Sequence, residues 1–264
     1  MTVWALLLEY DGTPFVGWQR QGVGLSVQGV LEAAASRLTN GEHVPSFAAW
    51  RTDAGVHAEA QAAMLSLPDR FAAGPIRDAL NYHMKPHPVV VLRAAPAPEG
   101  WNPRFSAVGR SYRFCILNRR ARPALGLHRA WHVERPLDAD AMAEAAALLL
   151  GQHDFTSFRA AACQARSPVR TLDRLDVTRR GEVIEVVAEA RSFLHHQVRN
   201  MVGTLALVGA GRWRPERVAQ ALAARDRSSA GPTAPPDGLY LTGVRYPADP
   251  FTTEPTPNAA KLMA

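Results

Sequence analysis

The sequence predicts an α/β fold of the α+β type, made of two halves that repeat one order of elements. Three observations favour it: apolar runs of strand length, apolar stripes with helical spacing, and a proline-rich connector in the middle of the chain. Of the 264 residues, 47% are hydrophobic and 20% are charged, which is a globular balance. The chain is therefore long and apolar enough to bury a sizeable core.

The first half opens with an apolar run, residues 3–8, that stops at the turn signal of residues 11–14. This pattern predicts a strand that is buried on both faces. Ser26 can cap a helix over residues 27–38, whose apolar positions form one helical stripe, and Asn40-Gly41 can end it. The remaining elements expected in this half are a strand at 61–67, a helix at 75–83 and a strand at 88–94.

The second half repeats this order after a connector rich in proline, residues 95–103. Its expected elements are a strand at 112–117, a helix capped by Asp138 and running to 150, a hairpin of 172–177 and 183–190, helices at 194–208 and 215–224, and a strand at 239–244. Each half is typical of a split βαβ unit. We place one domain at residues 1–105, a second at 106–247, and a loose tail at 248–264.

The charge of the chain favours a polyanionic partner. The net charge is +6 at a sequence pI of about 9.9, and nearly all basic residues are arginines. A solvated basic face would give the same composition. The two cysteines, Cys115 and Cys163, have no metal-binding or disulfide spacing, which suits a reduced cytoplasm. The amino-terminal run reads as a buried strand rather than a signal peptide, and no apolar stretch is long enough to span a membrane.

One candidate for chemistry is the segment Arg51-Thr52-Asp53-Ala54-Gly55-Val56-His57-Ala58, which precedes a predicted strand. Asp-Ala-Gly suits a tight turn, and its small residues would let another molecule approach the backbone closely. Asp53 would project from this turn. The same residues also fit an Asx-turn, in which the carboxylate bonds only local backbone.

A second candidate is the segment at residues 191–200, which crosses from a strand to a helix. His195 and His196 are adjacent, so on a helix they should point in different directions and make a poor metal pair. Arg199 lies beside the apolar stripe, where a buried guanidinium would need an anionic partner, although it could also be a helix-end residue at the surface. Tyr112 fits either the core or a stacking platform for a base.

Taken together, these segments resemble the bacterial tRNA pseudouridine synthase A family. The match runs in chain order over nearly the whole sequence through Tyr10-Asp11-Gly12-Thr13, Gly17-Trp18-Gln19, Val27-Gln28-Gly29, Arg51 to Ala58, Arg104-Phe105-Ser106-Ala107, Arg110-Ser111-Tyr112, Gly151-Gln152-His153-Asp154-Phe155, Phe193-Leu194-His195-His196, Val198-Arg199-Asn200 and Gly238-Leu239-Tyr240-Leu241. Each segment alone is a weak signal, whereas the ordered set is specific.

The resemblance implies two ferredoxin-like halves that share one extended, mostly antiparallel sheet, with helices on its outer face and the active-site cleft between the halves. It implies a homodimer that modifies nucleotides 38, 39 and 40 of the anticodon stem-loop of tRNA, without a cofactor or a metal. It also implies the catalytic carboxylate, Asp53, and four substrate-binding residues: Tyr112 on the target base, Arg199 paired with Asp53, Leu239 in the pocket wall, and Arg51 in base extrusion.

The sequence departs from the family pattern in two places. Trp50 stands where a glycine usually precedes the Arg-Thr-Asp run, and Trp101-Asn102-Pro103 replaces the usual Phe-His-Ala. Two other functions stay open at this stage. A non-catalytic tRNA-binding module would need only the basic charge, and an unrelated hydrolase would use Asp53 with His57. For the isomerase, the carboxylate could add covalently to the sugar or base, or remove a sugar proton to give a glycal.

Overall fold

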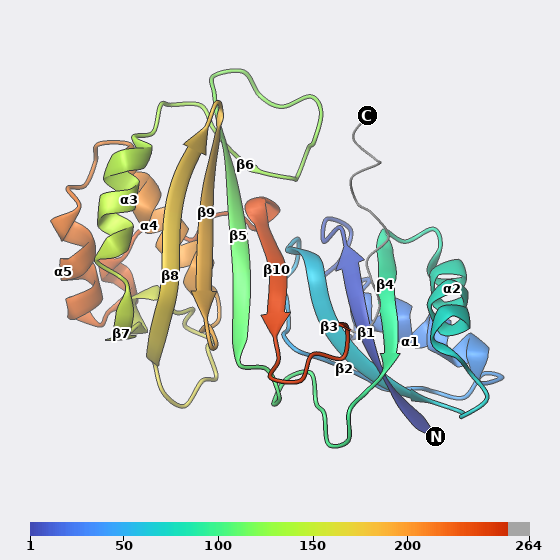
Figure 1. Cartoon of the computed structure of the whole chain (residues 1–264). Helices are drawn as coiled ribbons and strands as arrows, with labels where there is room; N and C mark the ends of the chain where they lie inside the picture. Colours follow the sequence, from blue (N-terminus) through green and yellow to red (C-terminus); the bar gives the residue numbers. More distant parts are fainter. Residues whose placement is uncertain (253–264) are drawn as a thin grey trace.

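The structure is a computed structural model and describes residues 1–252. Within that range the chain forms one sheet of ten strands and five α-helices (Figure 1). The helices α1 and α4 both lie behind the strands in Figure 1, so the two halves cover the same face of the sheet. The α/β fold expected from the sequence is confirmed. Over residues 1–252, no helix combines the length and the apolarity needed to cross a membrane.

The first half is a ferredoxin-like unit. Its elements in chain order are β1 (Thr2–Tyr10), α1 (Val27–Leu38), β2 (Ser46–Ala48), β3 (His57–Leu67), α2 (Ala73–Met84) and β4 (Val89–Pro96). The strands lie in the order β4-β1-β3, with β2 on the outer side of β3, and every pair is antiparallel. The cap expected for the first helix is present, because the Ser26 hydroxyl accepts a hydrogen bond from Gly29 N–H at 3.2 Å.

The second half repeats this arrangement and extends it by two short strands, β6 and β7. Its elements are β5 (Gly109–Asn118), β6 (Trp131–Val133), α3 (Ala139–Ala147), β7 (Gly151–Asp154), β8 (Val169–Arg180), β9 (Val183–Ala190), α4 (Gln197–Gly209), α5 (Glu216–Ala224) and β10 (Leu239–Arg245). The strand order β10-β5-β9-β8 matches that of the first half, and β7 adds to the edge of β8.

The two halves join through β10, the last strand of residues 1–252. β10 pairs with β5 in antiparallel fashion and with β3 in parallel fashion, at Tyr240 opposite His57 and Leu241 opposite Ala58. Along β5 the buried side chains Tyr112, Phe114 and Ile116 alternate with partly exposed ones. They belong to one continuous apolar cluster that runs through both halves beneath the helices.

Several expected boundaries differ from the structure. The strand expected at 61–67 begins earlier, at His57, and the helix expected to reach residue 150 ends at Ala147. The helix expected from residue 194 begins at Gln197, because the Gln197 side chain accepts a hydrogen bond from Leu194 N–H at 2.8 Å and His196 has a φ of 61°. The strands β2, β6 and β7, with three, three and four residues, were too short for an apolar pattern to reveal.

The domain division proposed from the sequence stays a prediction. Residue 105 falls in the connector between β4 and β5. Of the expected tail at 248–264, residues 253–264 lie outside the described part of the chain. Phe251 is buried, and its carbonyl accepts a hydrogen bond from Arg93 Nη1 at 2.7 Å.

Candidate active site

Asp53 lies in a tight turn between β2 and β3. Its carbonyl accepts a hydrogen bond from Val56 N–H at 3.1 Å, and Gly55 within the turn has a φ of 77°. A second segment crosses close to this turn at Gly17, whose φ is 107°. A Cβ at Gly17 would lie 2.6 Å from the Thr52 carbonyl oxygen. The turn therefore depends on two glycines, each of which has a positive φ and a close neighbour where a Cβ would lie.

Hydrogen bonds from neighbouring elements fix the residues that precede Asp53. Trp18 N–H donates to the Thr52 carbonyl at 3.0 Å, and the Tyr10 hydroxyl lies 2.8 Å from Thr52 Oγ1. Gln61 Nε2 donates to Tyr10 Oη at 3.4 Å and to the Trp50 carbonyl at 2.8 Å. Burial raises the pKa of Tyr10 to about 12, so its phenol stays protonated. The turn is thus anchored on β1 and β3.

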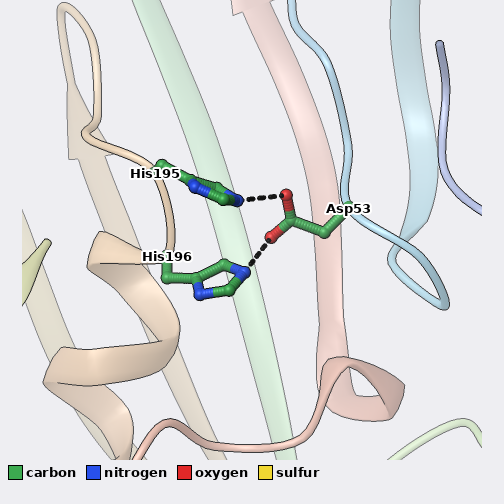
Figure 2. A group of neighbouring side chains, drawn as sticks. All are labelled: Asp53, His195 and His196. Atoms are coloured by element: carbon green, nitrogen blue, oxygen red, sulfur yellow. Dashed lines mark ion pairs between the residues drawn. The ribbon is translucent and has the colours of Figure 1, made fainter. Parts of the chain in front are cut away.

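Three cationic or potentially cationic side chains converge on the Asp53 carboxylate. His195 Nε2 lies 3.2 Å from Oδ1, and His196 Nε2 lies 3.2 Å from Oδ2 (Figure 2). Arg199 Nη1 lies 3.5 Å from Oδ2. All three come from the loop after β9 and the first turn of α4, in the other half of the molecule. The carboxylate therefore connects the two halves across the middle of the sheet.

These neighbours decide the charge of Asp53. Burial is the largest single influence and raises the pKa of its carboxyl, but His196, His195 and Arg199 together outweigh burial and lower the pKa below its ordinary value. Burial also lowers the pKa of Arg199, and the Asp53 carboxylate opposes that shift. The site thus holds an ionised carboxylate that is half-buried, ready to act as a nucleophile or a base.

The convergence of the two histidines corrects the expectation that they would point apart. His195 lies in the loop before α4, and His196 adopts a left-handed conformation with φ 61° directly before the helix. Because neither residue has helical geometry, adjacent side chains can turn to the same carboxylate; their ring centroids are 4.0 Å apart. A positive φ is uncommon for any residue other than glycine, so the sequence alone does not predict it at His196.

Arg199 is held by backbone as well as by Asp53. Its Nε donates to the Ala234 carbonyl at 2.8 Å, and Ala234 N–H donates to the Arg199 carbonyl at 3.1 Å. The segment that carries Ala234 can approach because α4 has a glycine there: a Cβ at Gly203 would lie 1.8 Å from the Pro232 carbonyl oxygen. The guanidinium is therefore held in position beside Asp53 before any substrate binds.

Tyr112 and Leu239 form an apolar wall beside the Asp53 carboxylate. Tyr112 on β5 is buried and meets Phe193 edge-on, with ring centroids 5.2 Å apart. Burial raises the pKa of Tyr112 well above its ordinary value, so its phenol stays protonated. Leu239 on β10 is buried and lies opposite Phe114 of β5, which places it on the same face of the sheet as Tyr112.

A cavity of about 1670 Å³ encloses this group, with walls from both halves. Asp53, Tyr112, Arg199, Leu239 and Arg51 all line it, so the structure brings together the five site residues named from the sequence. Arg51 is exposed, and among residues 1–252 its side chain has no hydrogen bond or ion pair. The rim carries exposed side chains of two kinds: aromatic ones, Phe47 and Phe105, and basic ones, Arg104, Arg166 and Arg191.

The two departures from the family pattern have structural explanations. The Trp50 ring lies 5.6 Å from the Arg110 guanidinium carbon, so a bulky residue is accommodated by a cation–π contact. Arg110 is buried and donates to the carbonyls of Arg191 at 2.7 Å and Arg104 at 2.9 Å. It therefore joins segments of the cavity wall, a role that sequence reasoning missed. Asn102 caps the next turn, accepting from Arg104 N–H at 2.9 Å.

His57 does not take part in this site. Its ring is buried, Nδ1 accepts from Gly12 N–H at 3.0 Å, and Nε2 donates to the His128 carbonyl at 2.8 Å. Nδ1 also lies 3.1 Å from Asp11 Oδ1, so both nitrogens have partners other than Asp53. The partners of Asp53 are His195, His196 and Arg199. The hydrolase reading, which needed His57 beside Asp53, is wrong on this point.

The comparisons with known proteins identify the class and then the family. A family model described as tRNA pseudouridine synthase matches residues 145–247, which include β7 to β10 but not the turn that carries Asp53. The chain is 69% identical over 252 residues to tRNA pseudouridine synthase A of Acidiphilium cryptum (strain JF-5), covering 95% of this chain and 99% of that protein. The chain belongs to the tRNA pseudouridine synthase A family, which confirms the resemblance inferred from its motifs.

Two further relatives agree. The protein of the same name from Paramagnetospirillum magneticum (strain ATCC 700264 / AMB-1) is 60% identical over 256 residues, with 97% of this chain and 100% of the relative covered. That from Rhodospirillum centenum (strain ATCC 51521 / SW) is 59% identical over 246 residues, with 93% and 100% covered. A solved structure described as a Cbf5-Nop10-Gar1 complex has a TM-score of 0.37 and 11% identity, over 90% of this chain and 48% of that chain, a likeness too low for any conclusion.

Proposed function

We propose that this protein isomerises uridine to pseudouridine at positions 38, 39 and 40 in the anticodon stem-loop of tRNA, with Asp53 as the catalytic carboxylate. The observation that carries the proposal is the ionised Asp53 carboxylate, held by Arg199 and two histidines beside the apolar wall of Tyr112 and Leu239. A non-catalytic tRNA-binding protein would have no use for a half-buried carboxylate fixed in this way.

The reaction breaks the N1–C1′ bond of uridine, turns the base and joins C5 to C1′, so nothing enters or leaves overall except the exchange of a proton. Asp53 either adds to the sugar or base, or removes a sugar proton, and both routes require the ionised form. Arg199 supports this form, because a charge pair at about 4 Å is worth roughly 4 kcal/mol at an effective dielectric near 20. Solvent in the open cavity reduces this value.

A uridine in a helical stem reaches Asp53 only after it leaves the stack. Extrusion costs a few kcal/mol and is least costly near a loop, which agrees with the lower end of an anticodon stem. Contact with an aromatic ring can return about 1–3 kcal/mol per base. Tyr112 and Leu239 are the apolar groups placed to receive the base. The exposed guanidinium of Arg51 is free to fill the space that the base leaves in the stem or to bind a neighbouring phosphate.

The rim of the cavity suits an RNA backbone. Arg51, Arg104, Arg166 and Arg191 are all exposed there, and Phe105 projects beside them. Each guanidinium that contacts a phosphate releases counterions, so the logarithm of the affinity should fall with the logarithm of the salt concentration. Binding of tRNA measured from about 50 to 200 mM salt tests this; an affinity that does not change with salt would remove these arginines from the interface.

The proposal includes a homodimer in the cytoplasm, as the family resemblance implies. A second copy would enlarge the surface available to a molecule as long as tRNA. Multi-angle light scattering of the purified chain measures its mass directly, and a monomer at micromolar concentration would refute the dimer without affecting the catalytic assignment.

The decisive experiment replaces Asp53 by asparagine, which keeps the shape and removes the charge. We expect the Asp53→Asn variant to bind tRNA and to release no tritium above background from tRNA labelled at uridine C5. The matched control is Asp78→Asn, since this carboxylate is exposed on α2, and it should retain the full rate. Substantial tritium release by Asp53→Asn would exclude Asp53 from the chemistry.

A further inference from the structure

The cluster of Asp53, His195 and His196 has the composition and spacing of a metal site. We propose that these three residues bind a divalent transition metal ion, with Zn²⁺ as the best-suited example, and that the bound ion inhibits the enzyme. The binding part of this inference stands on the cluster alone, whereas the inhibition part rests on the proposed catalytic role of Asp53.

The donor atoms lie close enough together to surround one ion. One ligand atom from each residue lies within 4.8 Å of the other two. The two His Nε2 atoms lie 3.2 Å from separate oxygens of Asp53 (Figure 2). Ligands bound at 2.0–2.1 Å with tetrahedral angles are about 3.3 Å apart. Small side-chain rotations would therefore be enough to centre an ion between the two imidazoles and one carboxylate oxygen.

The donor set also selects the kind of ion. Two imidazoles and one carboxylate suit Zn²⁺, Co²⁺, Ni²⁺ and Fe²⁺, whereas Mg²⁺ prefers six oxygen ligands. Within residues 1–252, the structure gives neither His195 nor His196 a side-chain hydrogen bond other than those to Asp53. Either imidazole can thus carry its hydrogen on Nδ1 and present Nε2 to a metal. In this part of the chain neither histidine has the outer partner that usually supports a ligand histidine, which predicts modest affinity.

The cluster is accessible from the cavity. The side chains of His195, His196 and Asp53 are 42%, 27% and 26% exposed, and all three residues line the open space above Tyr112. An ion can enter with its water, and three protein ligands leave a fourth position for that water. This exposure distinguishes the cluster from a closed structural site.

Arg199 sets a limit on the binding. Its Nη1 lies 3.5 Å from Asp53 Oδ2 and repels any cation placed there. Only an ion that gains strongly from bonding to imidazole nitrogen overcomes this repulsion, so the Mg²⁺ that accompanies RNA should not compete. A metal-bound carboxylate is no longer available to attack uridine or remove its proton, and the enzyme should lose activity while the ion is bound.

Direct titration without RNA tests the binding. Untagged protein freed of metal is titrated with ZnCl₂ in an isothermal calorimeter, and Co²⁺ is added separately to observe its visible absorption. We expect one ion per chain, and at least about tenfold weaker binding for His195→Ala and His196→Ala. The control His83→Ala removes an exposed histidine on α2 and should bind as the wild type does. Equal Zn²⁺ binding by the wild type and the His195→Ala/His196→Ala double variant would overturn the site.

An activity assay on the wild-type protein tests the inhibition. Turnover of the metal-free enzyme first establishes the proposed function by itself. Zn²⁺ at the concentration that fills the site should then abolish turnover, a chelator should restore it, and Mg²⁺ should have no such effect. Full turnover with the site filled would overturn the inhibitory role, and inactivity of the metal-free enzyme would instead count against the proposed function.

Discussion

The guanidinium of Arg199 lies 3.5 Å from the Asp53 carboxylate while its Nε is bound to the carbonyl of Ala234. One side chain therefore has two tasks: it supports the charge of Asp53, and it is held in position by backbone of a different segment. A planar fork with several donors can do both at once, whereas an ammonium on a flexible stem cannot.

Arg199→Lys should therefore keep the positive charge but lose the fixed orientation toward Asp53. Hydrogen bonds to charged groups contribute about 1.5–3 kcal/mol, so kcat for pseudouridine formation should fall by about tenfold to hundredfold, with a smaller change in the affinity for tRNA. Single-turnover tritium release separates the two quantities. Arg217→Lys, at an exposed position on α5, is the matched control. A wild-type rate for Arg199→Lys would show that charge alone is sufficient.

Tyr10→Phe should disturb the catalytic turn without touching the substrate. The change removes the hydroxyl that contacts Thr52, next to Asp53, and leaves a buried partner unpaired. Such a loss costs about 1–3 kcal/mol of the free energy of unfolding, measured by urea denaturation. We also expect kcat to fall by about tenfold because the turn is less well fixed.

The control for this change is Tyr240→Phe, which loses a hydrogen bond to the Arg129 carbonyl at 2.7 Å and none to the residues of the turn. Both variants should lose stability, but only Tyr10→Phe should lose turnover per folded molecule. If Tyr240→Phe lost turnover to the same extent, the effect of Tyr10→Phe would come from the loss of stability and not from a change in the turn at Asp53.

Gly17→Ala should be severely disruptive. Its φ of 107° is unfavourable for alanine, and the added Cβ would meet the Thr52 carbonyl oxygen at 2.6 Å. Strain of this kind costs about 1–3 kcal/mol, and it falls on the turn that carries Asp53. Gly22→Ala is the paired substitution, since Gly22 is exposed and nothing lies within 4 Å of its added Cβ. Gly17→Ala should lower both the melting temperature, measured by thermal denaturation, and the turnover. Gly22→Ala should change neither.

Phe105→Ala should weaken the binding of tRNA rather than the chemical step. Phe105 is 79% exposed at the rim of the cavity, with the Arg104 guanidinium carbon 5.6 Å from its ring centroid. Loss of one base-stacking contact costs about 1–3 kcal/mol, so Kd for tRNA should rise by about fivefold to a hundredfold, while the rate at saturation stays the same. Tyr82→Ala removes an aromatic that is 69% exposed on α2, outside the cavity. Filter binding should show no change for Tyr82→Ala; equal weakening in both variants would contradict the assignment of the rim.

The elements that local sequence determines were predicted well. The first helix was placed from Ser26 and its apolar stripe, and the structure has both the helix and the cap. The turn at Asp53 was placed from the small residues Ala54 and Gly55, and Gly55 does adopt a positive φ. In each case the information lies within a few neighbouring residues, so a pattern can report it.

Features that depend on distant segments were not predicted from residue patterns. The convergence of His195 and His196 requires the left-handed conformation of His196, which nothing in the local sequence demands. The buried position of Arg110 depends on carbonyls from separate loops, and the parallel pairing of β10 with β3 joins residues more than 180 positions apart. The five site residues were named through family resemblance, and only the folded chain brings them into one cavity.

The position of β10 also determines when this enzyme can assemble during synthesis. Its residues, Leu239–Arg245, leave the ribosome after every other strand of residues 1–252, yet they lie in the middle of the sheet between β3 and β5. Until then the amino-terminal half carries Asp53 without the strand that connects it to the half carrying Arg199. A nascent chain therefore has no complete active site until translation has passed β10, and premature termination before it should leave a sheet without its central strand and no activity.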